Sequence, residues 1–236
     1  MKKKGQITFY IIIGVLILLL FGMSTLLTTV EDDQKTSSFT PVDTFIDLCL
    51  KQSAEQELRI LGLYGGDIDA EIFLASEFSS IPIFSENHEI NKEHFLSNLT
   101  FVVNNGLNGC FNNFESLKKQ GFVFEEYDQK LTIDENLNVK LFIPFKVSKG
   151  KTTKAYSEFV TKIDLNLDGF LNLTNSFLDE IFEVKGIPLK FMLDVQNENG
   201  IIINTFQSGD YDIYTIDYPM DGEYYLFMFA VKGVFI

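Results

Sequence analysis

The chain has 236 residues, 46% of them apolar, with 24 Phe and a net charge of −14. This apolar content can bury the core of one large domain or two small ones. The excess of Asp and Glu excludes a surface suited to nucleic acid, because it repels the phosphate backbone.

Residues 7–30 form an uncharged apolar run that follows Lys2, Lys3 and Lys4 and precedes three consecutive acidic residues. At ~1.5 Å per residue, a helix of this length can cross a hydrocarbon core of ~30 Å. A cleaved secretory signal has an apolar region of only ~7–15 residues and a small-residue cleavage site, which is missing before Glu31. We therefore predict a single transmembrane anchor in residues 1–30. The lysines place its N-terminus in the cytoplasm and the C-terminal domain outside the cell membrane.

Residues 31–40 are charged, small and polar, which is typical of a tether. The extracytoplasmic domain is expected to occupy residues 41–236 and to have an α+β fold. It should be helical over residues 41–120 and built mostly of strands over residues 121–236, with a short helix near 170–185.

Two long helical regions are predicted. The first begins with Thr40 as N-cap and Pro41 in the first turn, and it ends at Gly65 and Gly66. One face carries an apolar stripe, which is made of Ile46, Leu50, Ala54, Leu58 and Leu61. The second region covers residues 91–119, and its glycine-containing segment NNGLNG is expected to break or kink the helix.

From residue 122 onward, apolar residues alternate with polar ones over three segments, which predicts an antiparallel meander with one buried face. Four further strands are expected after Pro188, in the segments KFMLDV, GIIINTF, YDIYTIDY and EYYLFMFAVKGVFI. The last is apolar on both faces, as a central strand would be. Its length of about 13 residues is too short for a membrane span.

Cys49 and Cys110 are the two cysteines of the chain. In an exported domain, such a pair is most simply a disulfide, worth roughly 4 kcal/mol by the chain-entropy model. Two unrelated buried thiols are the alternative.

No catalytic motif stands out. The nucleophile-elbow pattern and the glycine-rich phosphate and dinucleotide loops are missing, and the abundant carboxylates single out no pair. His88 and His94 are six residues apart, which places them roughly 240° apart around a helix and argues against a zinc pair. We expect no cofactor and favour a non-enzymatic protein.

The segment DLNLDGFLN resembles the start of a hand-type calcium loop. Asp164, Asn166 and Asp168 occupy its first, third and fifth positions, and Gly169 occupies the sixth. Asn175 stands at the twelfth position, where a bidentate Glu is usual. The alternative is that the same residues end a strand whose polar side chains face solvent.

Two glycan acceptor sequons begin at Asn98 and Asn172. The first falls on a predicted helix, so the second is the favoured site of modification. Glycosylation at either position requires that the domain be exported, as the predicted anchor implies.

The stretch KGQIT, from Lys4 to Thr8, resembles an archaeal class III signal, which a prepilin peptidase cuts after the glycine. The resemblance implies a cut between Gly5 and Gln6, with the apolar stem kept on the mature protein. The chain departs from this pattern at Tyr10, where such signals usually have Glu, and at the tether, which interrupts the stem helix.

The rest of the chain resembles uncharacterised single-pass surface proteins of small-genome archaea. The similar blocks are VDTFIDLCLKQSAEQELRILGLYGG, GLNGCFNNFESLKKQGF, VKLFIPFKVSKGKTT and YYLFMFA. This resemblance implies a place in the cell envelope and agrees with the disulfide, but it implies no activity.

The sequence thus predicts a membrane-anchored, extracytoplasmic protein of the cell envelope that acts as a structural or interaction module. The first alternative is a pilin-like filament subunit processed after Gly5, and the second is an envelope enzyme or solute-binding protein. The expected partners are the membrane, through one span, and either other envelope proteins or further copies of the chain, but not nucleic acid.

Overall fold

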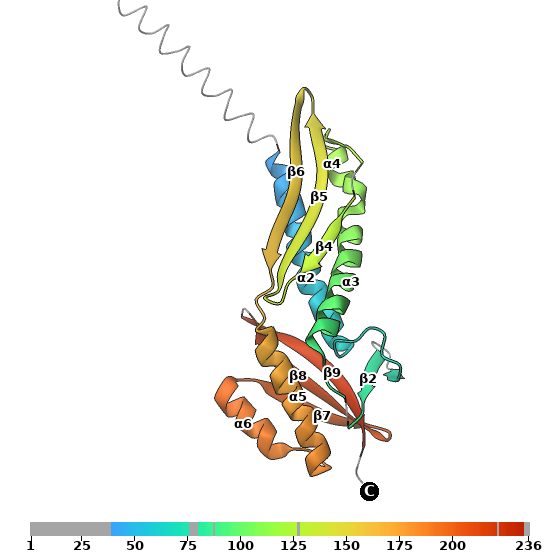
Figure 1. The fold of residues 1–236 in the computed structure, drawn as a ribbon, viewed down its shortest axis with the longest axis vertical. Coiled ribbons are helices and arrows are strands. Elements are labelled where there is room, and N and C mark those ends of the chain that lie inside the picture. The colour runs from blue at the N-terminus through green and yellow to red at the C-terminus, as the bar shows by residue number, and fades with distance from the viewer. Residues whose placement is uncertain (1–38, 76–79, 87, 127, 221, 234–236) are drawn as a thin grey trace, which may run out of the picture.

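The computed structural model describes residues 39–75, 80–86, 88–126, 128–220 and 222–233. The molecule is elongated, with the start of the described chain near one end and its C-terminal end at the other (Figure 1). We call residues 39–63 and 92–162 the proximal lobe, and the described residues of 64–91 and 163–233 the distal lobe. The predicted anchor lies outside the described residues, and no helix within them is long and apolar enough to span a bilayer.

The proximal lobe contains two long helices, α2 (Thr40–Leu63) and α3 (Lys92–Phe111), which pack against each other. A disulfide joins Cys49 to Cys110 with their Cα atoms 5.7 Å apart, as predicted. The predicted apolar stripe of α2 is confirmed, because all five of its side chains are fully buried.

The start of α2 differs from the prediction. Thr40 is the first helical residue, and Phe39 occupies the N-cap position without a side-chain hydrogen bond. The Phe39 side chain is buried in the core, so the folded domain begins within the segment predicted to be tether. At the other end, Gly65 and Gly66 adopt positive φ angles and end the helix as expected.

The predicted break at NNGLNG is wrong, because α3 continues through both glycines of that segment. Gly106 faces α2, and a Cβ there would lie 2.6 Å from the carboxylate oxygen of Glu57. The glycine thus allows close contact between two helices. The chain leaves α3 at Asn112, which has a left-handed backbone, and continues through a 3-10 turn, η1 (Asn112–Phe114), into the short α4 (Glu115–Lys118).

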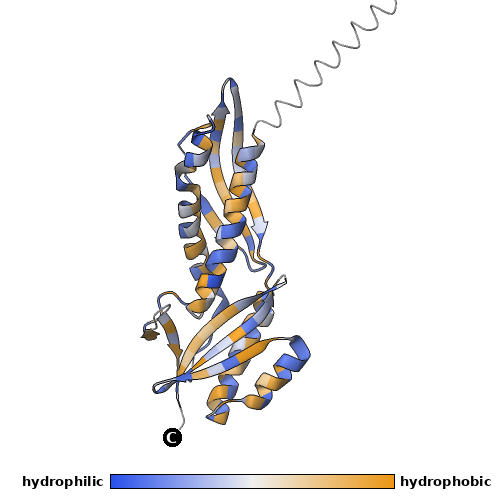
Figure 2. Ribbon diagram, turned by 180° about the vertical axis from the view of Figure 1, so that it is seen from behind, coloured by the Kyte–Doolittle hydropathy of each residue, from blue (hydrophilic) through white to orange (hydrophobic). Residues whose placement is uncertain are grey.

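The proximal sheet is the predicted antiparallel meander. Its central strand β5 (Asn138–Lys149) pairs with β6 (Thr152–Lys162) on one side, and with β4 (Lys130–Ile133) and β3 (Val123–Phe124) on the other. Buried and exposed residues alternate along β5. The helices α2 and α3 cover the buried face, and the opposite face is exposed to solvent (Figures 1 and 2).

The distal sheet has the strand order β1-β2-β9-β8-β7. Its strands are β1 (Phe73–Ala75), β2 (Ser80–Phe84), β7 (Ile202–Ser208), β8 (Tyr211–Met220) and β9 (Glu223–Lys232). All neighbours are antiparallel except β2 and β9, which are parallel. β9 is the central strand, as its apolar sequence predicted.

Two helices, α5 (Leu167–Val184) and α6 (Leu189–Asn199), belong to the distal lobe. α5 includes the helix predicted near residues 170–185, whereas α6 corrects the strand predicted for KFMLDV. A short apolar run does not distinguish a strand from a helix by its period alone. Here Phe191, Met192 and Val195 pack together at helical spacing against the core, and Gly200 ends the helix with a φ of 67°. The strands β1 and β2, in a region expected to be helical or loop, were not predicted.

One hydrophobic cluster runs through both lobes, from Phe39 at one end to β9 in the distal sheet. The C-terminal end of α2 makes the connection, because Gly62 lies against the Leu226 backbone and the Tyr225 ring. Arg59 also donates to the Tyr224 carbonyl and forms an ion pair with Glu223. The lobes are therefore joined by apolar packing as well as by the chain.

Candidate interaction surface

One face of the distal sheet is covered by helices and filled with aromatic rings. Phe170 of α5 lies 5.0 Å, between ring centroids, from both Tyr225 and Phe227 of β9. Phe177 lies 5.3 Å from Tyr214 of β8 in the same edge-to-face manner. Tyr214, Tyr225 and Phe227 are thus large side chains of β8 and β9 that point toward the helices.

The side chains at the remaining, alternate positions of these strands lie on the opposite side of the sheet, which we call the open face. Figure 2 shows the distal strands in front of α5 and α6, with no described helix crossing this face. The strand registers place three rows of side chains on it: Phe206, Ile213 and Ala230; Asn204, Thr215 and Met228; and Ile202, Asp217 and Leu226. Ile83 extends the first row onto β2, and Ile81 and Leu74 lie beyond it at the sheet edge.

The centre of the open face is apolar, although its rows also include Asn204, Thr215 and Asp217. Ile81, Ile213 and Ala230 are buried and form a second hydrophobic cluster, separate from the main core. Phe206 and Tyr224, at the margins, are 48% and 50% exposed. A sheet face that meets only water normally carries mostly polar side chains, so this composition makes the open face a candidate interaction surface.

The outer face of the proximal sheet shows the ordinary pattern. There Phe142 is flanked across the strands by Lys130 and Glu158, and Lys140 stands between Thr132 and Val160. The outer face of the proximal sheet thus carries a larger share of polar side chains than the open face does.

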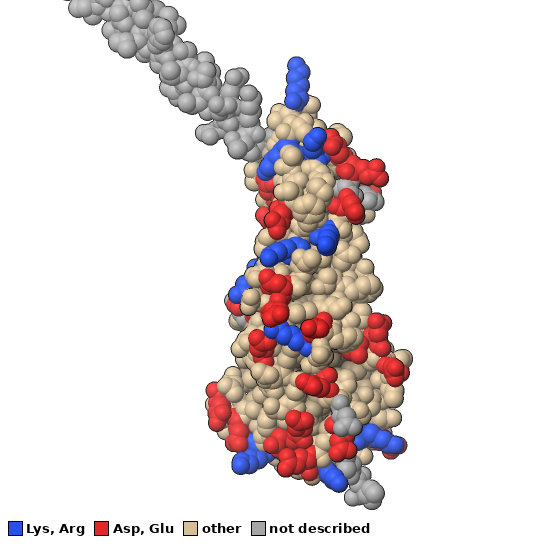
Figure 3. Space-filling model, viewed as in Figure 1, with Lys and Arg blue, Asp and Glu red and all other residues tan. Residues whose placement is uncertain are grey.

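Charge also divides between the lobes. The proximal lobe carries 12 acidic and 12 basic residues, whereas the described distal lobe carries 16 acidic residues and three lysines. In Figure 3, which shows the side of the molecule that carries α5 and α6, acidic and basic side chains mix over the proximal lobe, and acidic ones predominate over the distal lobe. The acidity noted in the sequence thus belongs to the lobe with the open face.

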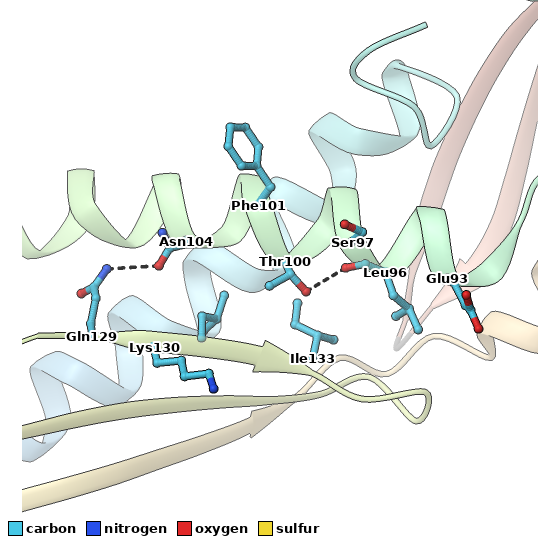
Figure 4. Close-up of a pocket in the computed structure, with 10 residues that line it drawn as sticks. Glu93, Leu96, Ser97, Thr100, Phe101, Asn104, Gln129, Lys130 and Ile133 are labelled. Carbon is cyan, nitrogen blue, oxygen red and sulfur yellow. Dashed lines mark hydrogen bonds between the residues drawn. The ribbon is translucent and has the colours of Figure 1, made fainter.

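A groove of about 600 Å³ lies between α3 and β4 in the proximal lobe. Two hydrogen bonds engage some of its polar groups: Gln129 Nε2 donates to Asn104 Oδ1 at 3.3 Å, and the Thr100 hydroxyl donates to the Leu96 carbonyl at 2.7 Å (Figure 4). The Phe101 ring points away from β4. The groove holds an apolar floor and a few polar groups without a set of converging reactive side chains.

The predicted calcium residues lie at the start of α5. The Asn166 side chain caps the helix by accepting from the Gly169 N–H at 3.1 Å. The Asp168 carboxylate lies 2.8 Å from Lys92 Nζ, and this hydrogen bond raises the pKa of Lys92. Because residues 167–175 are helical, the twelve-residue loop geometry is not formed there. Within the described part of the chain, no group of three or more His, Cys, Asp or Glu is placed to hold a metal ion.

The two sequons have different environments. Asn98 is buried, and its Nδ2, the atom that would carry a glycan, donates to the Gly66 carbonyl at 3.1 Å. Asn172 is exposed on α5, so its side chain is accessible in the folded protein. Glycosylation at Asn172 stays a prediction, and at Asn98 it would disrupt the fold.

The two histidines lie near one carboxylate, a grouping that helical spacing did not predict. His88 precedes α3 instead of lying on it, so the argument from helical angles does not apply. His94 Nε2 lies 3.2 Å from Asp67 Oδ1, and the His88 ring stacks on Phe84 at 3.8 Å between centroids. Burial lowers the pKa of His88, the neighbouring His94 lowers it slightly further, and Asp67 opposes the shift.

We expect His88→Phe to reduce the loss of stability on acidification. Because the folded state lowers the His88 pKa below its ordinary value, protonation favours unfolding, and stability falls as the pH drops through about 6.5. Phe keeps the stacking on Phe84 and cannot titrate. The urea midpoint should therefore change less between pH 7.5 and 5.5 in the variant than in the native protein. Asp67 and His94 are present in both proteins, so equal pH dependence would show that His88 contributes nothing.

No protein-family model matches the chain, and neither a curated protein nor a solved structure matches it. The argument for function therefore depends on the chain's own residues. The feature without an explanation in the fold is the open face, and it lies in the acidic lobe.

Proposed function

We propose that this chain is a membrane-anchored, extracytoplasmic module of the cell envelope that binds a partner through the open face. The observation that carries the proposal is that Phe206 and Tyr224 are 48% and 50% exposed on a face with an apolar centre, over which no described helix lies. Apolar side chains that face water gain stability when a partner covers them, at roughly 25 cal/mol per Å² of apolar surface.

The arrangement of the lobes supports this proposal. The chain enters the described domain at Phe39, at the end of the proximal lobe, while the open face belongs to the distal lobe (Figure 1). An anchor in residues 7–30 would therefore hold the proximal lobe toward the membrane and direct the distal lobe away from it. In this orientation the proximal lobe, whose charges balance, would lie nearer the membrane, and the acidic distal lobe would lie farther from it.

The anchor is tested by Ile17→Lys combined with Leu18→Lys. Each lysine at the centre of an apolar span costs about 2.5–3.5 kcal/mol of insertion free energy, so the variant should leave the membrane fraction after alkaline extraction. The native protein should remain in the membrane, with its C-terminal domain digested by protease added outside intact cells. Recovery of native protein in the soluble fraction would contradict the anchor and the proposed location.

A pilin-like subunit is the second candidate. It is favoured by the start of α2 near one end of the molecule, only ten residues after the apolar run. Intact mass distinguishes the two candidates. A protein that lacks residues 1–5 and is released from cells by shearing would support the filament, whereas a full-length protein that requires detergent would support a plain anchor.

A further inference from the structure

We infer that the partner of the open face is cationic: a protein surface or segment that presents apolar side chains flanked by Lys or Arg. This inference rests on the proposed function, because it names the chemistry of the molecule that the open face binds. It follows from the size of the face, from the charges around it and from the repulsion that a second copy would meet.

The size of the face suits a protein partner. The five strands contain 35 residues. At ~3.3 Å per residue and ~4.8 Å between strands, they cover roughly 550 Å² of sheet plane. A standard protein interface buries about 800 Å² on each side. The face is thus large enough to form the centre of such an interface, with its rim supplied by the surrounding loops.

The rim of the face is acidic. Asp217 lies on the face itself, between Ile202 and Leu226. Asp210 lies in the turn between β7 and β8, and Glu71 comes shortly before β1, both with exposed side chains. Lys232, which pairs with Tyr211 at one end of the same face, is the one lysine on a described strand of this sheet. An interface with an apolar centre and an acidic rim is complementary to a partner whose rim is basic.

A second copy of the chain is disfavoured by the same charges. Two distal lobes packed face to face would bring together two copies of the acidic residues on and around the open face, Asp217, Asp210 and Glu71. At physiological salt, charges interact over about 8 Å, which includes the rims of two packed sheets. Anionic lipid head groups would be repelled for the same reason. A cationic partner gains from these charges instead.

The test uses the full-length protein in nanodiscs of phosphatidylcholine, which carry no net charge. The probes are two fluorescein-labelled synthetic peptides, one of alternating Leu and Lys and the other of alternating Leu and Glu. Fluorescence anisotropy measures binding. We expect the Leu-Lys peptide to bind, and its affinity to fall about tenfold or more between low and high salt. The Leu-Glu peptide should not bind, and empty nanodiscs control for binding to lipid.

Variants locate the binding. Phe206→Ser together with Met228→Ser should weaken binding of the Leu-Lys peptide about tenfold, because buried apolar side chains contribute most of the binding energy at interfaces. Phe142→Ser is the matched control, because Phe142 is 51% exposed on the proximal sheet and Phe206 is 48% exposed on the distal one. Circular dichroism and urea midpoints establish that each variant folds. An equal effect of the control variant would overturn the inference, since binding would then be a general property of an acidic protein.

A second probe separates failure of the inference from failure of the proposed function. The apolar dye ANS should fluoresce with the native protein and lose most of this signal in the Phe206→Ser, Met228→Ser variant. If ANS behaves in this way but the Leu-Lys peptide does not bind, the face is an interaction surface and its partner is not cationic. If neither probe binds, both proposals fail. Self-association in sedimentation that is lost in the variant would identify a second copy as the occupant and overturn the inference.

Discussion

Serine in place of both Cys49 and Cys110 is expected to lower the free energy of unfolding by about 4 kcal/mol. The disulfide joins residues 61 positions apart, so it removes a large part of the freedom of the unfolded chain. The closed loop includes the second half of α2, the strands β1 and β2 and most of α3. Because these elements belong to both lobes, loss of the bond should destabilise the whole domain.

Urea unfolding followed by circular dichroism measures this effect. The double variant should unfold at a lower urea concentration than the native protein, and addition of a reductant should lower the native midpoint to a similar value. The double variant itself should not respond to reductant, which is the internal control. If native and variant proteins unfold at the same concentration without reductant, the bond does not contribute in the way that the chain-entropy model requires.

Alanine at Gly62 is expected to destabilise the protein by about 3 kcal/mol, because it forces apart the two lobes where α2 meets β9. A Cβ at this position would collide with the Leu226 carbonyl oxygen and would lie 2.8 Å from the Tyr225 ring. The carbonyl belongs to the central strand of the distal sheet and cannot move independently. Tyr225 is fully buried, so its ring has little room to turn aside.

Gly109 in α3 provides the matched control for this substitution. It is also a helical glycine, but a Cβ there would meet nothing within 4 Å. Gly109→Ala should therefore stabilise the protein by up to about 1 kcal/mol through helix propensity alone. Thermal and urea unfolding of the two variants should shift in opposite directions. A stabilising Gly62→Ala would show that the lobes are not packed at this point as described.

Much of the fold could be predicted from local patterns. The buried stripe of α2 follows from apolar residues at helical spacing, and the meander of β4, β5 and β6 follows from strict alternation. The errors occur where short patterns are ambiguous. KFMLDV suits a strand or a helix, and NNGLNG contains Gly106, which here allows two helices to approach each other.

The candidate surface could be predicted only in part. The last strand was recognised as apolar on both faces, and this is the signal that leads to the open face. Nothing in the sequence, however, indicates that α5 and α6 pack on the same side of the sheet and leave the other side without a helix (Figures 1 and 2). The alternative expectation, a strand covered on both faces, was equally compatible with its residues.

The sequence by itself determined the features that depend on neighbouring residues or on covalent chemistry: helix and strand periods, the cysteine pair, the uncharged apolar run of residues 7–30 and the total charge. The tertiary structure decided which sheet face is covered, that His88 and His94 lie near Asp67, and that the acidic excess belongs to the distal lobe. These properties depend on contacts between residues far apart in the chain. Such contacts are set by how whole elements pack, which local spacing does not encode.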